Sequence, residues 1–518
     1  MIALASAAGD IQFPSVEFWA LSPLLIVFGV ACVGVLLEAF LKPADRIRVQ
    51  PAVAVVGFAA AFVTTIQLRG EHRVVAAGNV AVDGPALFMG ATILALGITS
   101  VILLSERKID STGGALVASA AVLPGSVDAG AIALSKSIQT EAYPLMVFAV
   151  GGMMLFAQSN TLLTMFVALE ILSLPLYLMA GLARRQRLLS QEAAMKYFLL
   201  GAFSSAFFLY GLALLYGYAG TVTLSGIATA IASGGGKELY LYLGMAMLVV
   251  GLLFKVGAAP FHSWTPDVYQ GSPTPVTAFM AAGTKVAAFG AILRVFYVAF
   301  GDLRWDWRPV MWGAAILTMI VGSVIAITQT DVKRMLAYSS IAHAGFILVG
   351  VAAANRDGLS SSMFYLAVYG FTTIGAFAIV TLVRDANGEA THLAQWQGLG
   401  KKSPLLAGAF AFFLLALAGI PLTSGFVGKF AVFQAAIAGN ATILVVVGVL
   451  ASAIAAFFYA RVIVLMFFQE PVAGGATVAI PSGATAAAIA IGLAVTLVMG
   501  IVPGPLLDLA DKAALFVR

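Results

Sequence analysis

Four ionisable residues lie inside long apolar runs of this 518-residue sequence: Glu170 in TMFVALEILSLPLYLM, Lys255 in MLVVGLLFKVGAAPF, Lys285 in AFMAAGTKVAAFGAI and Lys429 in IPLTSGFVGKFAVF. A charge at the centre of a membrane-spanning helix costs roughly 2.5–3.5 kcal/mol, and a residue in such a place is a functional candidate by default. Four unpaired charges would together cost on the order of 10 kcal/mol, comparable to the stability of a whole protein. These side chains must therefore pair, meet water or change protonation state.

The residue types favour proton transfer between these positions. The pKa of a lysine falls when its ammonium is desolvated or placed near another cation, and rises when a carboxylate approaches. Arginine cannot exchange its proton in this way, because its pKa exceeds about 12. A row of lysines and a glutamate joined by water is therefore suited to a proton relay. The competing interpretation is a set of ion pairs that hold helices together, but one glutamate cannot neutralise three lysines.

Two histidines are secondary candidates for the same path. His262 stands two residues after Pro260, where it either links members of a relay or hydrogen-bonds carbonyls that the proline frees. His343, in YSSIAHAGF, is expected to line a polar channel. Both are assigned to the proton path as secondary members.

Three other charged residues have mainly structural interpretations. Lys196 follows Glu192 by one helical turn, so it either forms an i,i+4 ion pair or joins the relay. Arg294 is expected to snorkel or to anchor its helix, and Asp267 to form a cap at a turn between two helices. Of these, Lys196 is kept as a third secondary candidate for the proton path.

The composition indicates a membrane protein. Hydrophobic residues make up 61% of the chain and charged residues 10%, against about 25% charged residues in a soluble domain. The mean hydropathy is +1.01. The net charge of +5 is interpreted as a sign of orientation rather than of a nucleic-acid partner. Cys32 is the single cysteine and the four histidines show no spacing suited to haem, so no disulfide, iron–sulfur cluster, metal or other redox centre is expected on this chain.

Apolar runs of the length that spans a bilayer, roughly 20 residues, recur along the whole chain. We predict fourteen spans, at about 18–41, 51–68, 84–104, 142–158, 160–183, 191–219, 239–264, 274–299, 309–328, 333–354, 361–383, 404–437, 440–468 and 482–503. The chain is therefore expected to lie in a lipid bilayer. No loop is long enough for a catalytic domain.

Basic residues are distributed unevenly between the loops. The odd-numbered loops hold Lys42, Arg46, Arg48, Arg107, Lys108, Lys136, Arg184, Arg185, Arg187, Lys333, Arg334, Arg384, Lys401 and Lys402. The even-numbered loops hold fewer: Arg69, Arg73, Lys237, Arg304, Arg308 and Arg356. The positive-inside rule puts the odd loops in the cytoplasm, so both termini are expected on the outer side. No removable signal peptide is expected, because a basic n-region and a convincing cleavage site are missing.

Two predicted spans carry helix breakers beside a lysine. The breakers are Gly257 and Pro260 after Lys255, and Gly419 and Pro421 before Lys429. Broken backbone at membrane depth survives only where it is buried in protein or lines a wet cavity, and paired interruptions in two halves are typical of inverted-repeat transporters. The sequence thus predicts an all-α polytopic membrane protein of about 14 transmembrane helices, with two inverted five-helix repeats (helices 4–8 and 9–13) and broken helices 7 and 12.

This pattern divides the chain into four parts. Residues 1–141 hold three N-terminal transmembrane helices and a loop rich in Ala, Gly and Ser, which covers about 105–141. Residues 142–300 form the first five-helix repeat and residues 301–468 the second. Residues 469–518 hold a C-terminal transmembrane helix and tail.

Several segments resemble the antiporter-like subunits of respiratory complex I, the proton-pumping NADH:quinone oxidoreductase, and most closely their bacterial subunit N branch. The most specific match is FKVGAAPFHSWTPDVYQGSPTPVTAFMAAGTK, residues 254–285, where the related L and M branches typically have PDAH in place of PDVY. Further matches are ALEILSLPLY, EAAMKYFLLGAFSSAFFLYG, DVKRMLAYSSIAHAGF and GIPLTSGFVGKF. The resemblance covers about 142–468, and the 105–141 segment looks like an insertion.

The resemblance implies roles for the four central residues. It implies that Glu170 and Lys255 form a switching pair, that Lys285 is the central relay residue and that Lys429, at the second broken helix, is its partner. Position 429 is usually glutamate in the M branch, which favours the N branch. Quinone reduction elsewhere in the complex would then drive proton translocation through this relay.

The resemblance also implies cofactors and partners. No cofactor is expected on this chain; FMN, iron–sulfur clusters, NADH and a quinone would belong to other subunits. The expected partners are the neighbouring antiporter-like subunit M, small K-, J- and A-type membrane subunits and the lipid bilayer of a bacterial inner membrane. No nucleic acid is expected.

Two alternatives remain at this point. A subunit of a cation/proton antiporter or of a membrane-bound hydrogenase would share the fold and the lysines, although the PDVYQG segment argues against it. A non-pumping membrane scaffold would need the lysines for stability alone.

Overall fold

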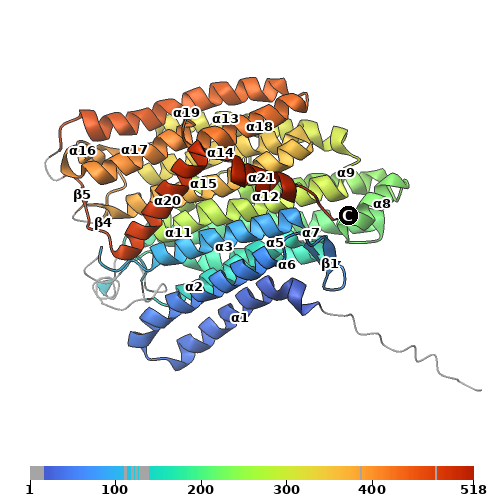
Figure 1. Ribbon diagram of the computed structural model, residues 1–518, viewed down its shortest axis with the longest axis horizontal. Helices are drawn as coiled ribbons and strands as arrows, with labels where there is room; N and C mark the ends of the chain where they lie inside the picture. The colour runs from blue at the N-terminus through green and yellow to red at the C-terminus, as the bar shows by residue number, and fades with distance from the viewer. Residues whose placement is uncertain are drawn as a thin grey trace, which may run out of the picture.

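The computed structural model describes residues 17–109, 114–117, 122, 126–127, 139–385, 388–472 and 475–517. These residues form one bundle of helices that lie side by side along a common direction (Figure 1). Most of the predicted 105–141 loop, Lys136 included, and the first residues of the chain lie outside the described residues.

Helices and connecting turns account for nearly all of the described chain. The helices up to residue 294 are α1 (Phe18–Phe40), α2 (Pro43–Gln67), α3 (Gly84–Leu104), α5 (Ala142–Gln158), α6 (Leu162–Ala180), α7 (Arg187–Ala219), α8 (Leu224–Ala232), α9 (Glu238–Val256), α10 (Trp264–Gly271), α11 (Thr274–Phe279) and α12 (Lys285–Arg294). The later helices are α13 (Arg304–Thr328), α14 (Val332–Ala353), α15 (Arg356–Leu382), α16 (Leu399–Lys402), α17 (Pro404–Ala418), α18 (Ser424–Ala438), α19 (Thr442–Phe468), α20 (Gly483–Ile501) and α21 (Gly504–Ala513).

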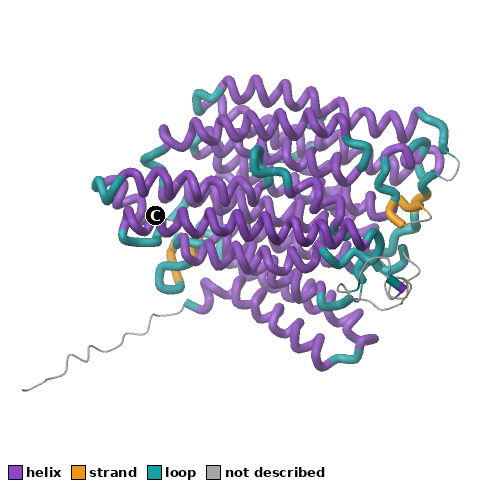
Figure 2. Tube along the Cα trace, turned by 180° about the vertical axis from the view of Figure 1, so that it is seen from behind, coloured by secondary structure: helices purple, strands orange, loops and turns teal. Residues whose placement is uncertain are grey.

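Short elements join the helices. Two π-helical turns, η1 (Met280–Thr284) and η2 (Val295–Ala299), flank α12, and a 3-10 turn, η3 (Leu393–Trp396), precedes α16. Strand β1 (Arg73–Val75) pairs antiparallel with β2 (Val80–Val82). Strand β3 (Val383–Asp385) pairs antiparallel with both β4 (Gly388–Glu389) and β5 (Thr477–Val478). Figure 2 shows these strands confined to the ends of the helical bundle.

The helix lengths agree with the predicted membrane protein. Among the described residues, twelve helical segments are long and apolar enough to cross a bilayer. Three shorter apolar helices, α5, α17 and α18, occupy the other two predicted spans, because α17 and α18 divide the run at 404–437. The all-α polytopic class is confirmed; the count of fourteen spans, the inverted repeats and the four-part division of the chain stay predictions.

Both expected interruptions are present, and a left-handed glycine ends the helix in each case. Helix α9 ends at Val256, followed by Gly257 with φ of 72°. Helix α17 ends at Ala418, followed by Gly419 with φ of 86°. Only glycine adopts this conformation without a steric penalty, so the sequence itself fixes where the two helices end. Each break leaves C-terminal carbonyls without an intrahelical partner inside the bundle.

The helices around the breaks are the most buried ones. Segment Thr274–Ala299, α14 and α15 are almost completely enclosed by other helices, whereas α1, α2, α19 and α20 leave most of their surface exposed. Figure 1 shows α1 at one edge of the bundle and α19 at the opposite edge. Polar side chains on the central helices are thus kept away from lipid.

The basic loops meet at one end of the bundle. Loop residues from four of the odd-numbered connections line one small cavity of about 70 Å³, with Arg184, Arg185, Arg384 and Lys333 among its walls. Glu106 lies at the same cavity, and its carboxylate accepts hydrogen bonds from Thr485 and Ser482. Burial raises the pKa of the Glu106 carboxyl, but these hydrogen bonds outweigh it and hold the pKa below its ordinary value.

A fully buried ion pair lies at the opposite end of the helical bundle. Asp83 caps α3 by accepting from the Ala86 amide at 3.0 Å, and it also accepts two bonds from the Arg294 guanidinium, at 2.7 and 2.9 Å. The backbone amide of Val517 donates to the same carboxylate, and Phe516 lies 4.9 Å from the guanidinium carbon. Arg294 therefore anchors its helix through this pair and does not snorkel, because both partners are completely buried.

Replacing Asp83 by Asn should destabilise the protein strongly. A buried arginine that loses its carboxylate costs about 3–5 kcal/mol. The midpoint temperature of unfolding in detergent should fall clearly below that of the unaltered chain. Glu71→Gln is the control, because the Glu71–Arg73 pair at 3.3 Å is substantially exposed and such pairs contribute about 0–1 kcal/mol. Equal midpoints for the two variants would contradict the assignment.

Candidate functional site

Lys255 and Glu170 lie close together but not in contact. Lys255, in the last turn of α9, is 4% exposed, and its Nζ donates to Ser173 Oγ at 2.7 Å. Ser173 lies one turn after Glu170 on α6. Its hydroxyl donates a hydrogen bond to the Leu169 carbonyl at 2.5 Å. No ion pair within 4 Å joins Glu170 to Lys255 among the described residues, and Glu170 Oε1 is buried without a hydrogen-bond partner there. Lys255 is therefore bonded to a serine on the helix that carries Glu170, and not to Glu170 itself.

Lys285 is held by the first broken helix. It begins α12 directly after the π-helical turn η1, and its Nζ donates to the Val256 carbonyl at 2.9 Å. Val256 is the last residue of α9, so this carbonyl is one that the break leaves free. The negative end of a helix dipole also favours a cation here. Because Val256 follows Lys255 in the chain, the end of α9 joins the two lysines.

Lys429 has the corresponding relation to the second break. It lies on α18, and its Nζ donates to the Leu417 and Ala418 carbonyls at 3.0 and 2.9 Å. A third bond, of 2.9 Å, goes to Ser452 Oγ on α19. The ring of Phe346 lies 4.6 Å from the ammonium, within the range of a cation–π contact. The last two residues of α17 thus supply carbonyl oxygens to a lysine from the helix that follows the break.

His343 lies near both of these lysines. It is buried on α14, and its Nδ1 shares a hydrogen with the Tyr365 hydroxyl at 2.8 Å, while Nε2 is 3.5 Å from the Tyr459 hydroxyl. Both Lys285 and Lys429 are near enough to act on its charge. Tyrosine hydroxyls therefore lie at both ring nitrogens of His343, and its place on a polar channel stays a prediction.

The two other secondary candidates lie in different surroundings. His262 is partly buried between α9 and α10, and its Nδ1 has no hydrogen-bond partner among the described residues. Lys196 forms the expected i,i+4 pair with Glu192 at 2.7 Å and a second pair with Asp267 at 2.6 Å. Its side chain is 41% exposed. These contacts favour an ion-pair role for Lys196, and its part in a relay stays a prediction.

Asp267 is the centre of that surface cluster. It lies in the first turn of α10, and it also accepts from Arg334 at 2.6 Å. Burial raises the pKa of this carboxyl, but hydrogen bonds from Lys196 and Arg334 outweigh it and hold the pKa below its ordinary value. The cluster therefore joins α7, α10 and α14 at all but acidic pH.

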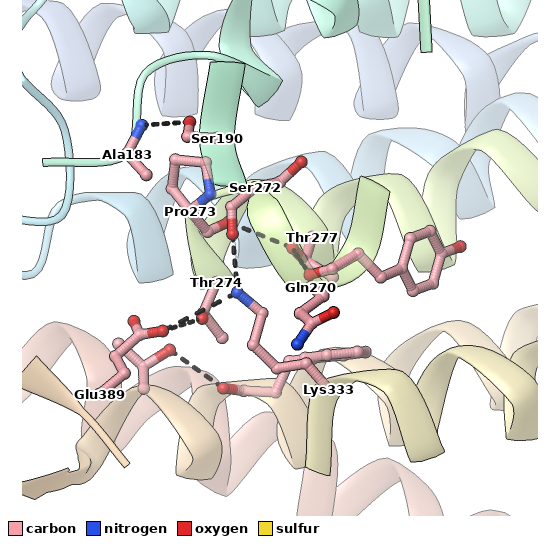
Figure 3. A network of polar contacts seen from close by, with 12 residues as sticks. Ala183, Ser190, Gln270, Ser272, Pro273, Thr274, Thr277, Lys333 and Glu389 are labelled. Carbon is pink, nitrogen blue, oxygen red and sulfur yellow. Dashed lines mark hydrogen bonds and ion pairs between the residues drawn. The ribbon is translucent and has the colours of Figure 1, made fainter. Parts of the chain in front are cut away.

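One buried lysine was not expected from the sequence. Lys333 was assigned to a cytoplasmic loop, but the structure places it in the first turn of α14 with its side chain 3% exposed. Figure 3 shows its Nζ directed at the Ser272 carbonyl, 2.7 Å away, and toward Glu389, 3.9 Å away. Glu389 in turn accepts from the Thr274 hydroxyl. The burial was not foreseen because Lys333 stands at the edge of an apolar run, where hydropathy cannot separate a buried first turn from a loop; its cytoplasmic side stays a prediction.

Comparison with known proteins decides the family. Residues 159–455, more than half of the chain, match the model described as NADH:quinone oxidoreductase/Mrp antiporter, TM. The chain belongs to this family. Two relatives carry the name NADH-quinone oxidoreductase subunit N: one of Parafrankia sp., 66% identical over 98% of this chain and 97% of the relative, and one of Rhodococcus opacus, 62% identical over 99% of both. This confirms the resemblance to the subunit N branch.

Solved structures of the family agree. A chain of respiratory complex I from Thermus thermophilus with bound aureothin is 35% identical, with a TM-score of 0.76 over 94% of this chain and 99% of that one. A chain of the Mrp complex from Dietzia sp. has a TM-score of 0.78 over 96% and 97%, at 21% identity. The second likeness shows a shared fold alone.

Gly419→Ala should disturb the packing of Lys429 against the second broken helix. Position 419 has φ of 86°, and an added Cβ would lie 2.9 Å from Lys429 Cδ. Left-handed backbone costs a non-glycine residue roughly 1–2 kcal/mol, so the unfolding midpoint in detergent should fall. Gly408→Ala on the same helix is the matched control, since nothing lies within 4 Å of its added Cβ. A midpoint for Gly419→Ala at or above that of Gly408→Ala would contradict this account.

Proposed function

We propose that the chain is the proton-translocating membrane subunit N of a bacterial NADH:quinone oxidoreductase. The observation that carries the proposal is the set of partners of the central lysines. Lys255, Lys285 and Lys429 are buried, and their ammonium groups donate to hydroxyls and free carbonyls at 2.7–3.0 Å. A lysine with such partners loses no ion pair when it gives up its proton.

Several contacts support a path through these residues. Lys255 bonds to Ser173, one turn from Glu170 on α6, and Lys285 bonds to the carbonyl next to Lys255 at the end of α9. We assign His343, which has tyrosine hydroxyls at both ring nitrogens, to the step between Lys285 and Lys429. A change of charge at the Glu170 end would alter the cost of protonating Lys255, and the proton would continue through Lys285 and His343 to Lys429.

The role of the remaining assembly follows from this proposal. NADH oxidation and quinone reduction belong to other subunits, which carry FMN and iron–sulfur clusters, and their energy reaches this chain through neighbouring membrane subunits. We assign those neighbours to subunit M and to the small K-, J- and A-type subunits. The complex lies in the bacterial inner membrane, with the basic end of the bundle in the cytoplasm and both termini outside.

The two alternatives receive less support. A cation/proton antiporter subunit would share the fold, but sequence identity to the Mrp chain is well below that to the complex I chain. A scaffold role explains buried ion pairs such as Asp83–Arg294, but it gives no reason for lysines without carboxylate contacts.

Glu170→Gln and Lys255→Ala should each abolish coupled proton transport. With inside-out membrane vesicles, the rate of NADH-driven acidification should fall by about tenfold or more, which corresponds to about 1.4 kcal/mol on the limiting step. NADH oxidation by an artificial acceptor that bypasses quinone should stay unchanged, because that chemistry lies on other subunits. Lys237→Gln, at an exposed loop position, is the control and should leave acidification intact. Unchanged NADH-driven acidification in both variants would exclude the relay.

A further inference from the structure

An apolar cavity of about 350 Å³ lies between α2, α3, α15, α20 and α21, away from the lysine path. Helix α3 lines it at every turn from Gly84 to Ala95. Eleven residues at 1.5 Å each span about 16 Å, and half of a typical hydrocarbon core is about 15 Å. The cavity thus runs from one end of the bundle to about its middle, a depth that matches one leaflet. Figure 1 shows α20 and α21 lying across the central helices.

Beyond its mouth the cavity has almost wholly apolar walls. Two threonines line the cavity, but Thr65 donates its hydroxyl to the Ala61 carbonyl at 2.7 Å and Thr92 to the Phe88 carbonyl at 2.9 Å. The other wall residues on this stretch are aliphatic or aromatic, such as Phe62. A cavity of this size needs polar partners to hold ordered water. Its natural occupant is therefore a hydrocarbon chain.

The mouth of the cavity is basic. Arg69, His72 and Lys512 line it at the end of the bundle where β1 begins. None of the three forms an ion pair within 4 Å in the part of the chain that the structure describes. The nearest acidic residues in the sequence are engaged elsewhere: Glu71 with Arg73 at 3.3 Å and Asp511 with Arg356 at 4.0 Å. Three basic side chains at the mouth of an apolar cavity match the charged headgroup and the apolar acyl chain of an anionic lipid.

We propose that this cavity binds one anionic phospholipid. An acyl chain lies along α3, and the phosphate lies among Arg69, His72 and Lys512. Arg and Lys side chains bind phosphate oxygens through charge-assisted hydrogen bonds. The lipid would fill the space between α2, α3 and α21 and so join the N-terminal helices to the C-terminal ones.

The test uses the chain in its native assembly, reconstituted into phosphatidylcholine nanodiscs. The probe is phosphatidylglycerol with a photoactivatable diazirine near the end of an acyl chain, and a matched phosphatidylcholine probe serves as the neutral comparison. Labelling of peptides from α3 is measured by mass spectrometry. Three variants are compared: Arg69→Gln with Lys512→Gln, which removes the mouth charges; Ala91→Phe, which fills the cavity; and Lys237→Gln with Arg304→Gln, exposed basic positions outside the cavity.

We expect the phosphatidylglycerol probe to label α3 more strongly than the phosphatidylcholine probe. Loss of two basic residues should weaken binding roughly 30-fold, at about fivefold for each, and Ala91→Phe should lower labelling while the Lys237/Arg304 control keeps it. Equal labelling by both probes, or full labelling in the Arg69/Lys512 variant, overturns the proposal. Absence of labelling in the unaltered assembly also overturns it, since a neighbouring subunit or no lipid would then fill the space.

Discussion

The structure depends on one constraint: backbone carbonyls freed by a broken helix must find donors inside the bundle, where water and lipid cannot supply them. Two glycines with positive φ create such carbonyls at the ends of α9 and α17. Lys285 and Lys429 supply the donors. Each lysine thereby satisfies a broken helix, and each broken helix lowers the cost of a buried ammonium. Neither feature would be tolerated at that depth without the other.

The buried arginine Arg294 has a different kind of partner from the central lysines. Arg294 has a permanent charge, and it is matched by the carboxylate of Asp83 with two hydrogen bonds and complete burial. This arrangement is fixed, because an arginine cannot give up its proton. The central lysines instead have neutral partners. A lysine can therefore lose its proton without leaving a bonded carboxylate unpaired. The contrast separates a structural ion pair from the proposed relay within one protein.

The sequence indicated which charged residues lie within membrane spans, but it did not indicate which groups they bond to. Hydropathy located Lys255, Lys285 and Lys429 in spans, and the adjacent glycines and prolines indicated the breaks. Periodicity cannot tell which way a side chain points around a bundle of many helices, so Ser173, Val256 and Ser452 were not foreseen as partners. Pairing between residues far apart in the chain, such as Asp83 with Arg294, likewise requires the tertiary structure. The burial of Lys333 was not foreseen because a helix's first turn has no hydropathy signal of its own.

The most direct test of this account is solid-state NMR transfer between lysine Nζ and backbone carbonyl carbons in membranes. With ¹⁵Nζ-lysine and ¹³C-carbonyl leucine, we predict a through-space signal from Lys429 to Leu417 that disappears in Lys429→Met. With ¹³C-carbonyl valine, the signal from Lys285 to Val256 should remain in that variant. A leucine signal that survives Lys429→Met, or the absence of both signals in the unaltered protein, would contradict the claim that the broken helices hold the relay lysines.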